Sequence, residues 1–296
     1  MSTQITTSMV SQFSANVQAL VQQKGSKLRA LIEIELIKGK NAYFEQIGSV
    51  AAVKKTTRHA DTPQMDTPHA RRCLTLETYN WADLIDNDDK VRMLIDPASE
   101  YANAAAWAMG RATDESIVDA ALGSAGTGEK GDIKVALPTK QKIVHGSTGF
   151  TFDKLREVKR VMDANDVPSE DRFIVLTADQ LDNLLSETKV TSADYAAAKA
   201  LVRGELDTFM GFRFVQVNGK RSDGSLIVPS FADSTKTIRQ CFAFQKAGVK
   251  LGIGQDIVGK ITERDDKCYA TQVYYEMSIG ATRMQEDMVV EVQCQE

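Results

Sequence analysis

The sequence predicts an α+β fold, in which one long helix is accompanied by several strand-rich stretches. Three observations lead to this fold class. Residues 97–122 are rich in alanine, begin with a proline and are followed by a glycine, which is typical of a helix about 37 Å long. Residues 50–79 contain two extended segments around a proline-containing tip. Residues 242–292 are rich in alternating or β-branched side chains, as strands are.

The composition is that of a globular protein. The 296 residues are 43% hydrophobic and 26% charged, which is enough to bury a large core in one or two domains. The polar start and the lack of an apolar run of about 18 residues argue against a signal peptide and a membrane span, so we expect synthesis in the cytoplasm. The four cysteines have no CxxC spacing and are expected to be reduced thiols rather than zinc ligands.

The charge is small but unevenly distributed. The net charge of −4 argues against a dedicated nucleic-acid binder. Residues 1–58 hold eight Lys or Arg and three Glu, a net +5, which leaves −9 for residues 59–296. A basic first fifth on an acidic body indicates an arm that meets acidic surface on a neighbouring copy or on another partner. Random unevenness of a solvated surface is the alternative explanation.

The N-terminal elements are predicted from their apolar spacing. Residues 8–23 carry apolar side chains three and four apart, which predicts an amphipathic helix. Residues 28–36 turn towards alternation and residues 42–47 form a second short extended run, so both are predicted to be strands.

The next stretch is predicted to be a hairpin arm. Residues 50–58 and 71–79 are expected to form its two strands, because Pro63 and Pro68 keep the segment between them extended or turning. A hairpin that buries little of its own surface is only marginally stable, so we expect it to lie on something else. A surface flap on the same monomer is the competing explanation.

The middle of the chain is predicted to mix short helices and strands. Residues 81–95 are expected to be helical or irregular, and residues 123–131 a glycine-rich loop. The spacing then predicts helices over 151–164, 178–185 and 192–202, and strands over 133–137, 142–144, 173–176 and 212–217.

The C-terminal part is predicted to be rich in strands. After a polar excursion over 222–234, strands are expected over 242–244, 249–253, 257–264, 269–283 and 289–292, with a hairpin turn at 264–267. We expect this part to return beside the long helix and to pair with early strands.

Motifs that would carry chemistry are not supported by their context. Gly126, Gly128 and Gly131 match GxGxxG, but a helix precedes this loop and a strand follows it, the reverse of a phosphate-binding loop. The three histidines lack metal-ligand spacing, the aspartates at 86–89 fail the calcium-loop pattern, and no GxSxG elbow occurs. We therefore expect no catalytic residues, no metal site and no cofactor, and an enzyme with a dispersed site is left as an alternative.

Five segments of the chain have a distinctive sequence: QQKGSKLR (22–29), DKVRMLIDPASEYANAAA (89–106), DANDVPSEDRFIVLTADQLDNLL (163–185), ADYAAAKALVRGELDTFMGFRFVQVN (193–218) and DKCYATQVYYEMSIGATRM (266–284). These segments resemble major capsid proteins of tailed bacteriophages, and most of all those of short-tailed phages. The resemblance extends over nearly the whole chain, and it implies the Hong Kong phage-type (Johnson) capsid fold.

This resemblance implies a division of the chain and a function. The implied parts are an N-terminal arm (1–40), an extended E-loop (41–80), a first part of the peripheral domain (81–168) with its spine helix (97–122), an axial domain (169–254) and peripheral return strands (255–296). The implied function is self-assembly, as hexamers and pentamers, into an icosahedral shell around phage double-stranded DNA. The implied partners are a scaffold, a portal and decoration proteins, and the implied location is the virion, after assembly in the host cytoplasm.

Within this interpretation, we expect the hairpin arm to clasp an adjacent copy. Its cationic candidates are Lys54, Lys55, Arg58, Arg71 and Arg72, and its apolar candidates are Val50, Val53, Leu74 and Leu76. The acidic candidates on the adjacent copy are Asp86, Asp88, Asp89, Asp114, Glu115 and Asp119. Reversal of Arg71 and Arg72 to Glu is expected to leave a soluble subunit that assembles badly. An encapsulin-like enzyme compartment, and an α/β enzyme or binding module that forms a small oligomer, are the alternative functions.

Overall fold

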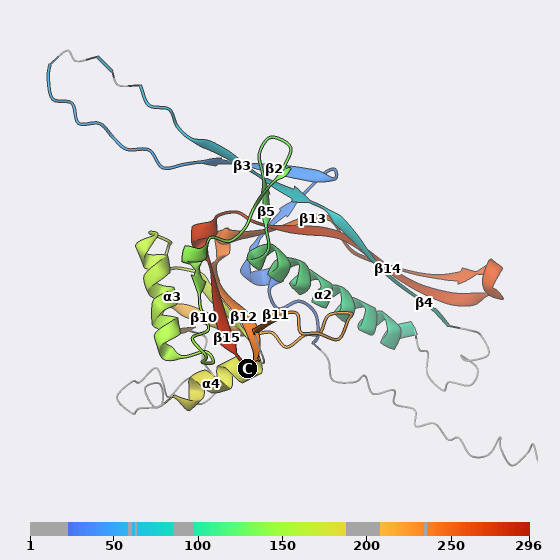
Figure 1. Cartoon of the computed structure of the whole chain (residues 1–296). Helices are drawn as coiled ribbons and strands as arrows, with labels where there is room; N and C mark the ends of the chain where they lie inside the picture. The colour runs from blue at the N-terminus through green and yellow to red at the C-terminus, as the bar shows by residue number, and fades with distance from the viewer. Residues whose placement is uncertain (1–22, 59–60, 63, 86–97, 188–207, 234–235) are drawn as a thin grey trace, which may run out of the picture.

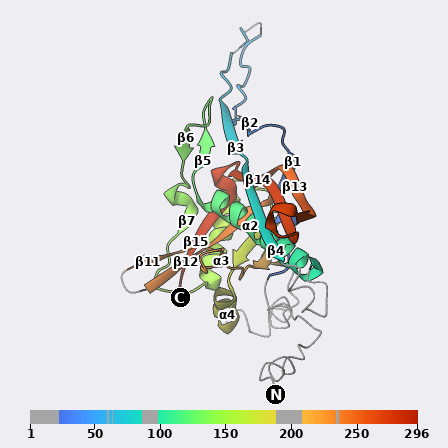
Figure 2. The same ribbon diagram turned by 90° about the vertical axis from the view of Figure 1, so that its right-hand side faces the viewer.

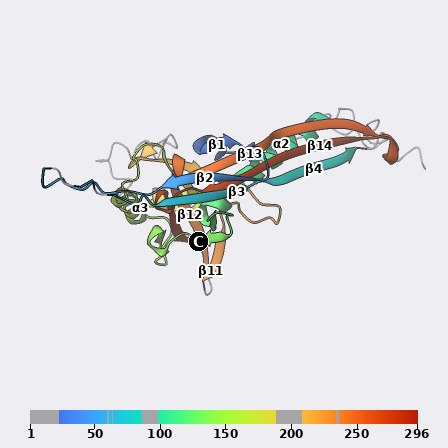
Figure 3. The same cartoon turned by 90° about the horizontal axis from the view of Figure 1, so that it is seen from above.

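The computed structural model describes residues 23–58, 61–62, 64–85, 98–187, 208–233 and 236–296. Within these residues the chain forms three sheets and three α-helices. A compact body carries two long projections that point in opposite directions, one made by the β2–β3 arm and one by the β13–β14 hairpin with β4 (Figure 1). Seen from above, both projections lie along one line (Figure 3).

The sheet that forms the β13–β14 projection has the strand order β1-β13-β14-β4. Its strands are β1 (Glu33–Leu36), β13 (Val249–Arg264), β14 (Ala270–Arg283) and β4 (Glu77–Ile85). The long helix α2 (Ala98–Leu122) packs along β14 and β13. Buried alanines at 105 and 121 let the helix approach the sheet closely, and Met109, Ile117 and Val118 fill the core between them.

The body is built on a seven-stranded sheet. Its path is β7 (Lys142–Ile143), β15 (Val289–Gln295), β12 (Lys236–Gln245), β8 (Arg172–Leu176), β10 (Phe212–Gln216) and β9 (Thr208–Phe209), and β11 (Ser230–Asp233) pairs with β12. Side chains of β12 alternate between two cores: Phe242 belongs to the core shared with α2, and Ala243 to the core under helix α3 (Phe152–Ala164). Helix α4 (Ala178–Ser186) lies at the lower end of the body (Figure 1).

The third sheet forms the base of the arm, in the order β2-β3-β5-β6. Its strands are β2 (Asn41–Ile47), β3 (His69–Thr75), β5 (Ala125–Thr127) and β6 (Ile133–Val135). The full length of β2 pairs with β3, from Asn41 opposite Thr75 to Ile47 opposite His69. In the view turned by 90°, the arm rises from the top of the molecule and stands clear of the body (Figure 2).

Most predicted elements are confirmed. The long helix, the helices at 151–164 and 178–185, the strands at 42–47 and 173–176, and the hairpin turn after Arg264 are all present within a residue or two. The C-terminal strands β13 and β14 pair with the early strands β1 and β4 beside α2, as expected. Short strands also lie at 133–135, 142–143 and 212–216.

The predicted pairing of the arm is wrong. Residues 50–58 are not a strand, and β3 pairs with β2 instead. The predicted second strand at 71–79 is divided between β3 and β4, and β4 runs on to Ile85 through the stretch predicted to be helical or irregular. The physical reason is that Tyr79 and Trp81 alternate towards the core shared with α2, which gives β4 a buried face.

Smaller corrections follow from tertiary contacts. Only Glu33–Leu36 of the predicted strand at 28–36 is a strand, because Leu28 and Ile32 are buried in the core beside α2. The strands predicted at 249–253 and 257–264 are one strand with an irregularity between Ile253 and Val258. Strands β5 and β11 occupy stretches predicted to be loops. The helices predicted at 8–23 and 192–202 lie outside the described residues, apart from Gln23.

Candidate inter-subunit surface

The outer part of the arm is free of its own body. The last backbone hydrogen bond between the two limbs runs from Gly48 N–H to Pro68 O, at 2.8 Å. Beyond it, the described residues at 49–67 belong to no strand. Val50 is 57% exposed and Val53 is 59% exposed. Lys54, Lys55 and Arg58 are exposed as well. This outer part therefore presents apolar and cationic side chains that no described residue of its own chain covers.

The base of the arm is attached tightly to the β13–β14 hairpin. Leu74 is only 1% exposed, and it lies where glycines in β13 and β14 leave room for it. A Cβ atom on Gly280 would lie 2.2 Å from the Thr75 carbonyl oxygen, closer than any real contact. Leu76 is half-buried and lies directly against Gly254. These contacts place Leu74 inside its own chain, so the expectation that it contacts an adjacent copy is corrected.

A buried ion pair also holds the arm base. Arg72 is 7% exposed, and its Nη2 donates to Glu286 Oε1 and Oε2 at 2.7 and 2.6 Å. Its Nε donates to the Met284 carbonyl at 3.0 Å. One guanidinium nitrogen thus donates to both carboxylate oxygens, as a charge-assisted hydrogen bond. Arg72 is therefore neutralised within its own chain, and the expectation that it reaches an adjacent copy is corrected for the same reason.

Arg283 joins this base to the end of the long helix. Its side chain is fully buried, and Nη1 donates to the carbonyl oxygens of Ala121 (2.9 Å) and Gly123 (2.6 Å), while Nη2 donates to Val135 O at 2.9 Å. A cation at a helix C-terminus satisfies carbonyls that lack a helical partner. Burial lowers the pKa of Arg283, and the nearby Glu286 opposes that shift. The arm base, α2 and β6 thus meet at one guanidinium.

Arg71 differs from its neighbour because it lies on the outer face of β3. Its Nε donates to Glu45 Oε1 at 2.6 Å, and its guanidinium lies over the Tyr43 ring at 5.5 Å from the centroid. The side chain is 37% exposed. Arg71 therefore has partners in its own chain but still offers a charged, solvent-facing edge.

Asp114 is corrected as an acceptor for the arm of an adjacent copy. It is 0% exposed on the inner side of α2, and it accepts hydrogen bonds from four residues of its own chain. The donors are the side chains of Gln23 and Ser26, both at 2.5 Å, and the backbone N–H groups of Lys27 and Leu28, both at 3.0 Å. Its carboxylate therefore fixes residues 23–28 to the long helix.

The other acidic candidates on α2 are also paired. Arg221 Nη1 donates to Glu115 Oε1 at 2.9 Å, and its Nη2 donates to Asp119 Oδ1 at 2.5 Å. The hydrogen bond with Asp119 raises the pKa of Arg221. The Asp119 side chain remains 54% exposed, so it can still face a second cation. Asp86, Asp88 and Asp89 lie outside the described residues.

The sequence does not predict two long-range contacts that hold the subunit together, those of Asp114 and Arg283. The segment at 22–29 carried a family resemblance, but no local pattern connects it to Asp114. Gly110 reveals the contact only in three dimensions, because a Cβ there would lie 2.5 Å from the Gly25 carbonyl carbon. The sequence around Arg283 likewise indicates only a residue at the end of a strand. No spacing rule could have found its role, because its partners lie 148 to 162 residues away.

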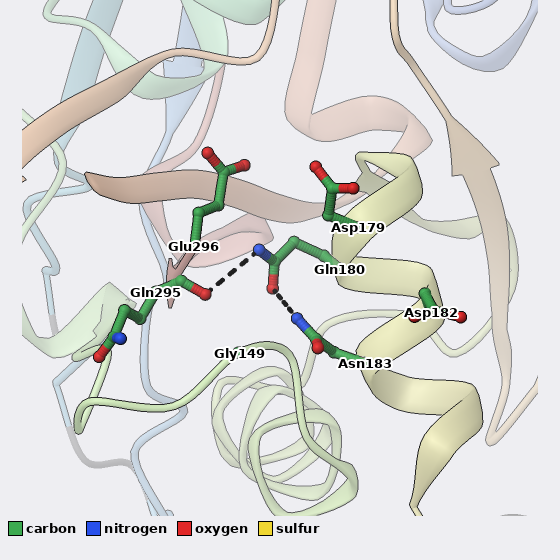
Figure 4. A pocket seen from close by; sticks show the side chains of 7 residues that line it. All are labelled: Gly149, Asp179, Gln180, Asp182, Asn183, Gln295 and Glu296. Carbon is green, nitrogen blue, oxygen red and sulfur yellow. Dashed lines mark hydrogen bonds between the residues drawn. The ribbon is translucent and has the colours of Figure 1, made fainter. Parts of the chain in front are cut away.

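A polar hollow of about 470 Å³ lies beside α4 and the end of β15 (Figure 4). Its lining residues are Gly149, Asp179, Gln180, Asp182, Asn183, Gln295 and Glu296. Gln180 Oε1 accepts from Phe150 N–H at 2.9 Å, and its Nε2 donates to Gln295 O at 3.5 Å. The lining contains no histidine, cysteine, serine or lysine, and its ionisable side chains are the carboxylates of Asp179, Asp182 and Glu296.

Two further observations concern the part of the chain that the structure describes. It contains no group of three or more His, Cys, Asp or Glu side chains placed to hold a metal ion. None of its helices combines the length and the apolar character that a membrane span requires.

The family of the chain is shown by a match to a family model. The model described as "Phage capsid protein" matches residues 5–296. The chain belongs to this family. It is accordingly a structural protein that associates with its own copies to form the shell of a virion. No curated protein matches the sequence.

Solved structures show that this phage capsid protein has the Hong Kong phage-type fold. The capsid of cyanophage P-SCSP1u is 19% identical, with a TM-score of 0.72 over 97% of this chain and 93% of that chain. Mycobacterium phage Che8 gives 17% identity and a TM-score of 0.69 over 96% and 97%. The head of Helicobacter pylori bacteriophage KHP40 gives 9% identity and a TM-score of 0.73 over 97% and 96%. At such identities the similarity concerns the fold.

Proposed function

We propose that the chain is the major capsid protein of a tailed phage, and that it assembles as hexamers and pentamers into an icosahedral shell around double-stranded DNA. The single observation that carries this proposal is the uncovered outer arm, with Val50 and Val53 more than half exposed and three cations beside them. A segment that buries so little of its own surface is stabilised when it lies on another copy. Each such contact recurs around a closed, symmetric shell.

The outer arm supplies the inter-subunit contact in this proposal. Lys54, Lys55 and Arg58 provide charge, and Val50 and Val53 provide apolar surface. An exposed ion pair contributes only about 0–1 kcal/mol, so the apolar pair is needed as well. Arg71, Leu76, Glu115 and Asp119 retain some exposure and stay in the set of candidate contacts, together with Asp86, Asp88 and Asp89.

We also propose the division of the chain that the resemblance implies, with one change. Residues 1–40 act as the N-terminal arm, 41–80 as the E-loop region, 81–168 and the return strands as the peripheral domain, and 169–254 as the axial domain. The change concerns the return strands at 255–296, because β15 pairs with β12 and β7. Residues 289–295 are therefore grouped with the axial sheet.

The contents and partners of the shell complete the proposal. A net charge of −4 suits a container from which DNA must leave, because a strongly basic lining would bind phosphates. Assembly takes place in the host cytoplasm with a scaffold and a portal, decoration proteins bind the outside, and the chain catalyses no reaction.

Light scattering and electron microscopy of the purified chain test this function. Particles of many megadaltons with an icosahedral outline are expected, whereas a small oligomer such as a dimer would have about 65 kDa, twice the 32.5 kDa of one chain. Particles isolated from infected or lysed cells should contain double-stranded DNA. Particles filled with an enzyme instead would identify an encapsulin-like compartment, and a stable dimer would contradict the proposal.

A further inference from the structure

Strand β1 is an open edge of the long sheet. It pairs with β13 on one side only, and it is the end strand of the four-stranded order. The Ile37 N–H bonds to Ile253 O on β13. Because backbone groups alternate in direction along a strand, those of Ile34 and Leu36 point away from β13. All four residues of β1 are exposed, so an unpaired edge of this kind can accept another strand.

The two faces of β1 differ in chemistry. Ile34 and Leu36 lie opposite Leu251 and Ile253 on the face that covers the core, but they are 46% and 82% exposed. Glu33 and Glu35 lie on the other face, where both carboxylates share the ammonium of Lys250 at 3.6 and 3.1 Å. One negative charge on this face is therefore left without a matching cation. The edge is apolar on one face and acidic on the other.

The first limb of the outer arm has the complementary pattern. In an extended chain, Ala51 and Val53 share one face, while Ala52, Lys54 and Arg58 share the other. Residues 50–58 contain three cations and no acidic residue, and the described residues there have no strand partner. The arm leaves its own body on the side away from the β13–β14 tip (Figure 3). We therefore expect the strand that pairs with β1 to come from a second copy of the chain.

We propose that residues 51–54 of one copy add to the free edge of β1 in an adjacent copy as an antiparallel strand. This inference rests on the proposed function, and it names the surface that receives the arm. The pairing sets Leu36 opposite Ala51, Glu35 opposite Ala52, Ile34 opposite Val53 and Glu33 opposite Lys54. Apolar side chains then meet on one face and opposite charges on the other.

The antiparallel direction follows from Lys55. In a parallel arrangement with Ile34 opposite Val53, Lys55 would lie opposite Leu36 and place a cation on the apolar face. In the antiparallel arrangement Lys55 lies beyond the end of β1, next to Ile32, and Lys54 has Glu33 directly opposite and Glu35 diagonally opposite. The apolar pairs on one face and the oppositely charged pair on the other set the register, because a slip of one residue would exchange the two faces.

Disulfide trapping in assembled shells tests this pairing. In a Cys268→Ser background, which removes the exposed native thiol, Glu35→Cys with Ala52→Cys is compared with Glu35→Cys with Ala51→Cys. Residues 35 and 52 are directly opposite in a non-hydrogen-bonded pair, where Cα atoms approach closely enough for a disulfide, whereas residue 51 faces the other side. After mild oxidation with diamide, the first pair should give about tenfold more covalent dimers and higher multiples than the second. All substituted positions are exposed, so the subunit fold is retained.

The outcomes separate the two proposals. Equal cross-linking of both pairs, no cross-linking, or a cross-link within one chain would overturn the strand addition while shells still form. If the unsubstituted chain forms no shells, both proposals fall. A second measurement uses charge: Lys54→Glu should reduce shell yield severalfold, and Glu33→Lys in the same chain should restore it. Failure of Glu33→Lys to restore the yield would count against the pairing of these two positions.

Discussion

The base and the outer part of the arm belong to the same segment of chain but are stabilised in different ways. At the base, Arg72 and Leu74 are enclosed by residues from β13, β14 and the turn that follows, and Gly280 of β14 lies directly against Thr75. In the outer part, Val50 and Val53 are exposed, and the described residues of the two limbs have no strand pairing beyond Gly48 and Pro68. The comparison shows that the base is held by contacts within its own chain, whereas the described residues of the chain leave the outer part exposed.

Substitution of Arg72, at the base, is expected to have the largest effect on the stability of the subunit. Arg72→Ala should reduce the free energy of unfolding of the unassembled subunit by about 3–5 kcal/mol, because it removes one member of a buried ion pair. Urea unfolding followed by circular dichroism measures the change. The double reversal of Arg71 and Arg72 to Glu is now expected to destabilise the subunit itself, before any effect on assembly. A shift below about 1 kcal/mol would mean that the base is as loosely held as the outer part.

Substitution of Gly280, on β14, tests how closely β14 packs against Thr75 of the arm base, without a change of charge. Gly280→Ala would bring a Cβ to 2.2 Å from Thr75 O, and we expect a loss of about 1–3 kcal/mol from the resulting overpacking. Thermal unfolding of the subunit gives the measurement. Gly39→Ala is not a suitable control, because its φ of 103° would strain alanine; Ala51→Ser in the outer arm is suitable. Equal stability of Gly280→Ala and the unsubstituted subunit would show that β3 can move away from β14.

Arg71 provides a matched comparison with Arg72, because the two residues are adjacent and of the same type. Arg71→Ala should cost only about 0–1 kcal/mol, since its pair with Glu45 is exposed to solvent. The same urea unfolding experiment compares both variants, and the effect of Arg71→Ala should shrink further in high salt. A cost equal to that of Arg72→Ala would remove the distinction between the inner and outer faces of β3.

The outer arm should show the smallest effect on the subunit. Val50→Ser with Val53→Ser should change the free energy of unfolding by no more than about 0.5 kcal/mol, because both side chains are already exposed. The same variant should lower the yield of shells in sedimentation or electron microscopy. A clear loss of subunit stability would show that the arm lies on its own body, and an unchanged shell yield would remove Val50 and Val53 from the interface.

The candidate surface was only partly predictable. Lys54, Lys55, Arg58, Val50 and Val53 are exposed in the subunit, because a polar segment with two prolines and few large apolar residues does not build a core of its own, and their contact with another copy stays a prediction. Arg72, Leu74 and Asp114 were assigned to an interface but are buried in the subunit. The sequence shows that Arg72 and Asp114 need an oppositely charged or hydrogen-bonding partner and that Leu74 needs apolar cover. It does not show whether the partner belongs to the same chain or to the next copy.

The sequence by itself determined the elements whose signal is local. Alanine content specifies the helix at 98–122, an apolar run specifies the buried strand at 172–176, and the wording of several segments identifies the capsid family. Only the tertiary structure decided which strands pair and which charges are buried. Arg72 meets Glu286 across 214 residues, and Asp114 meets Leu28 across 86. Periodicity in the sequence shows which face of a helix or strand is apolar. It does not show which distant segment packs on that face, because that depends on how the long intervening loops bring the segments together.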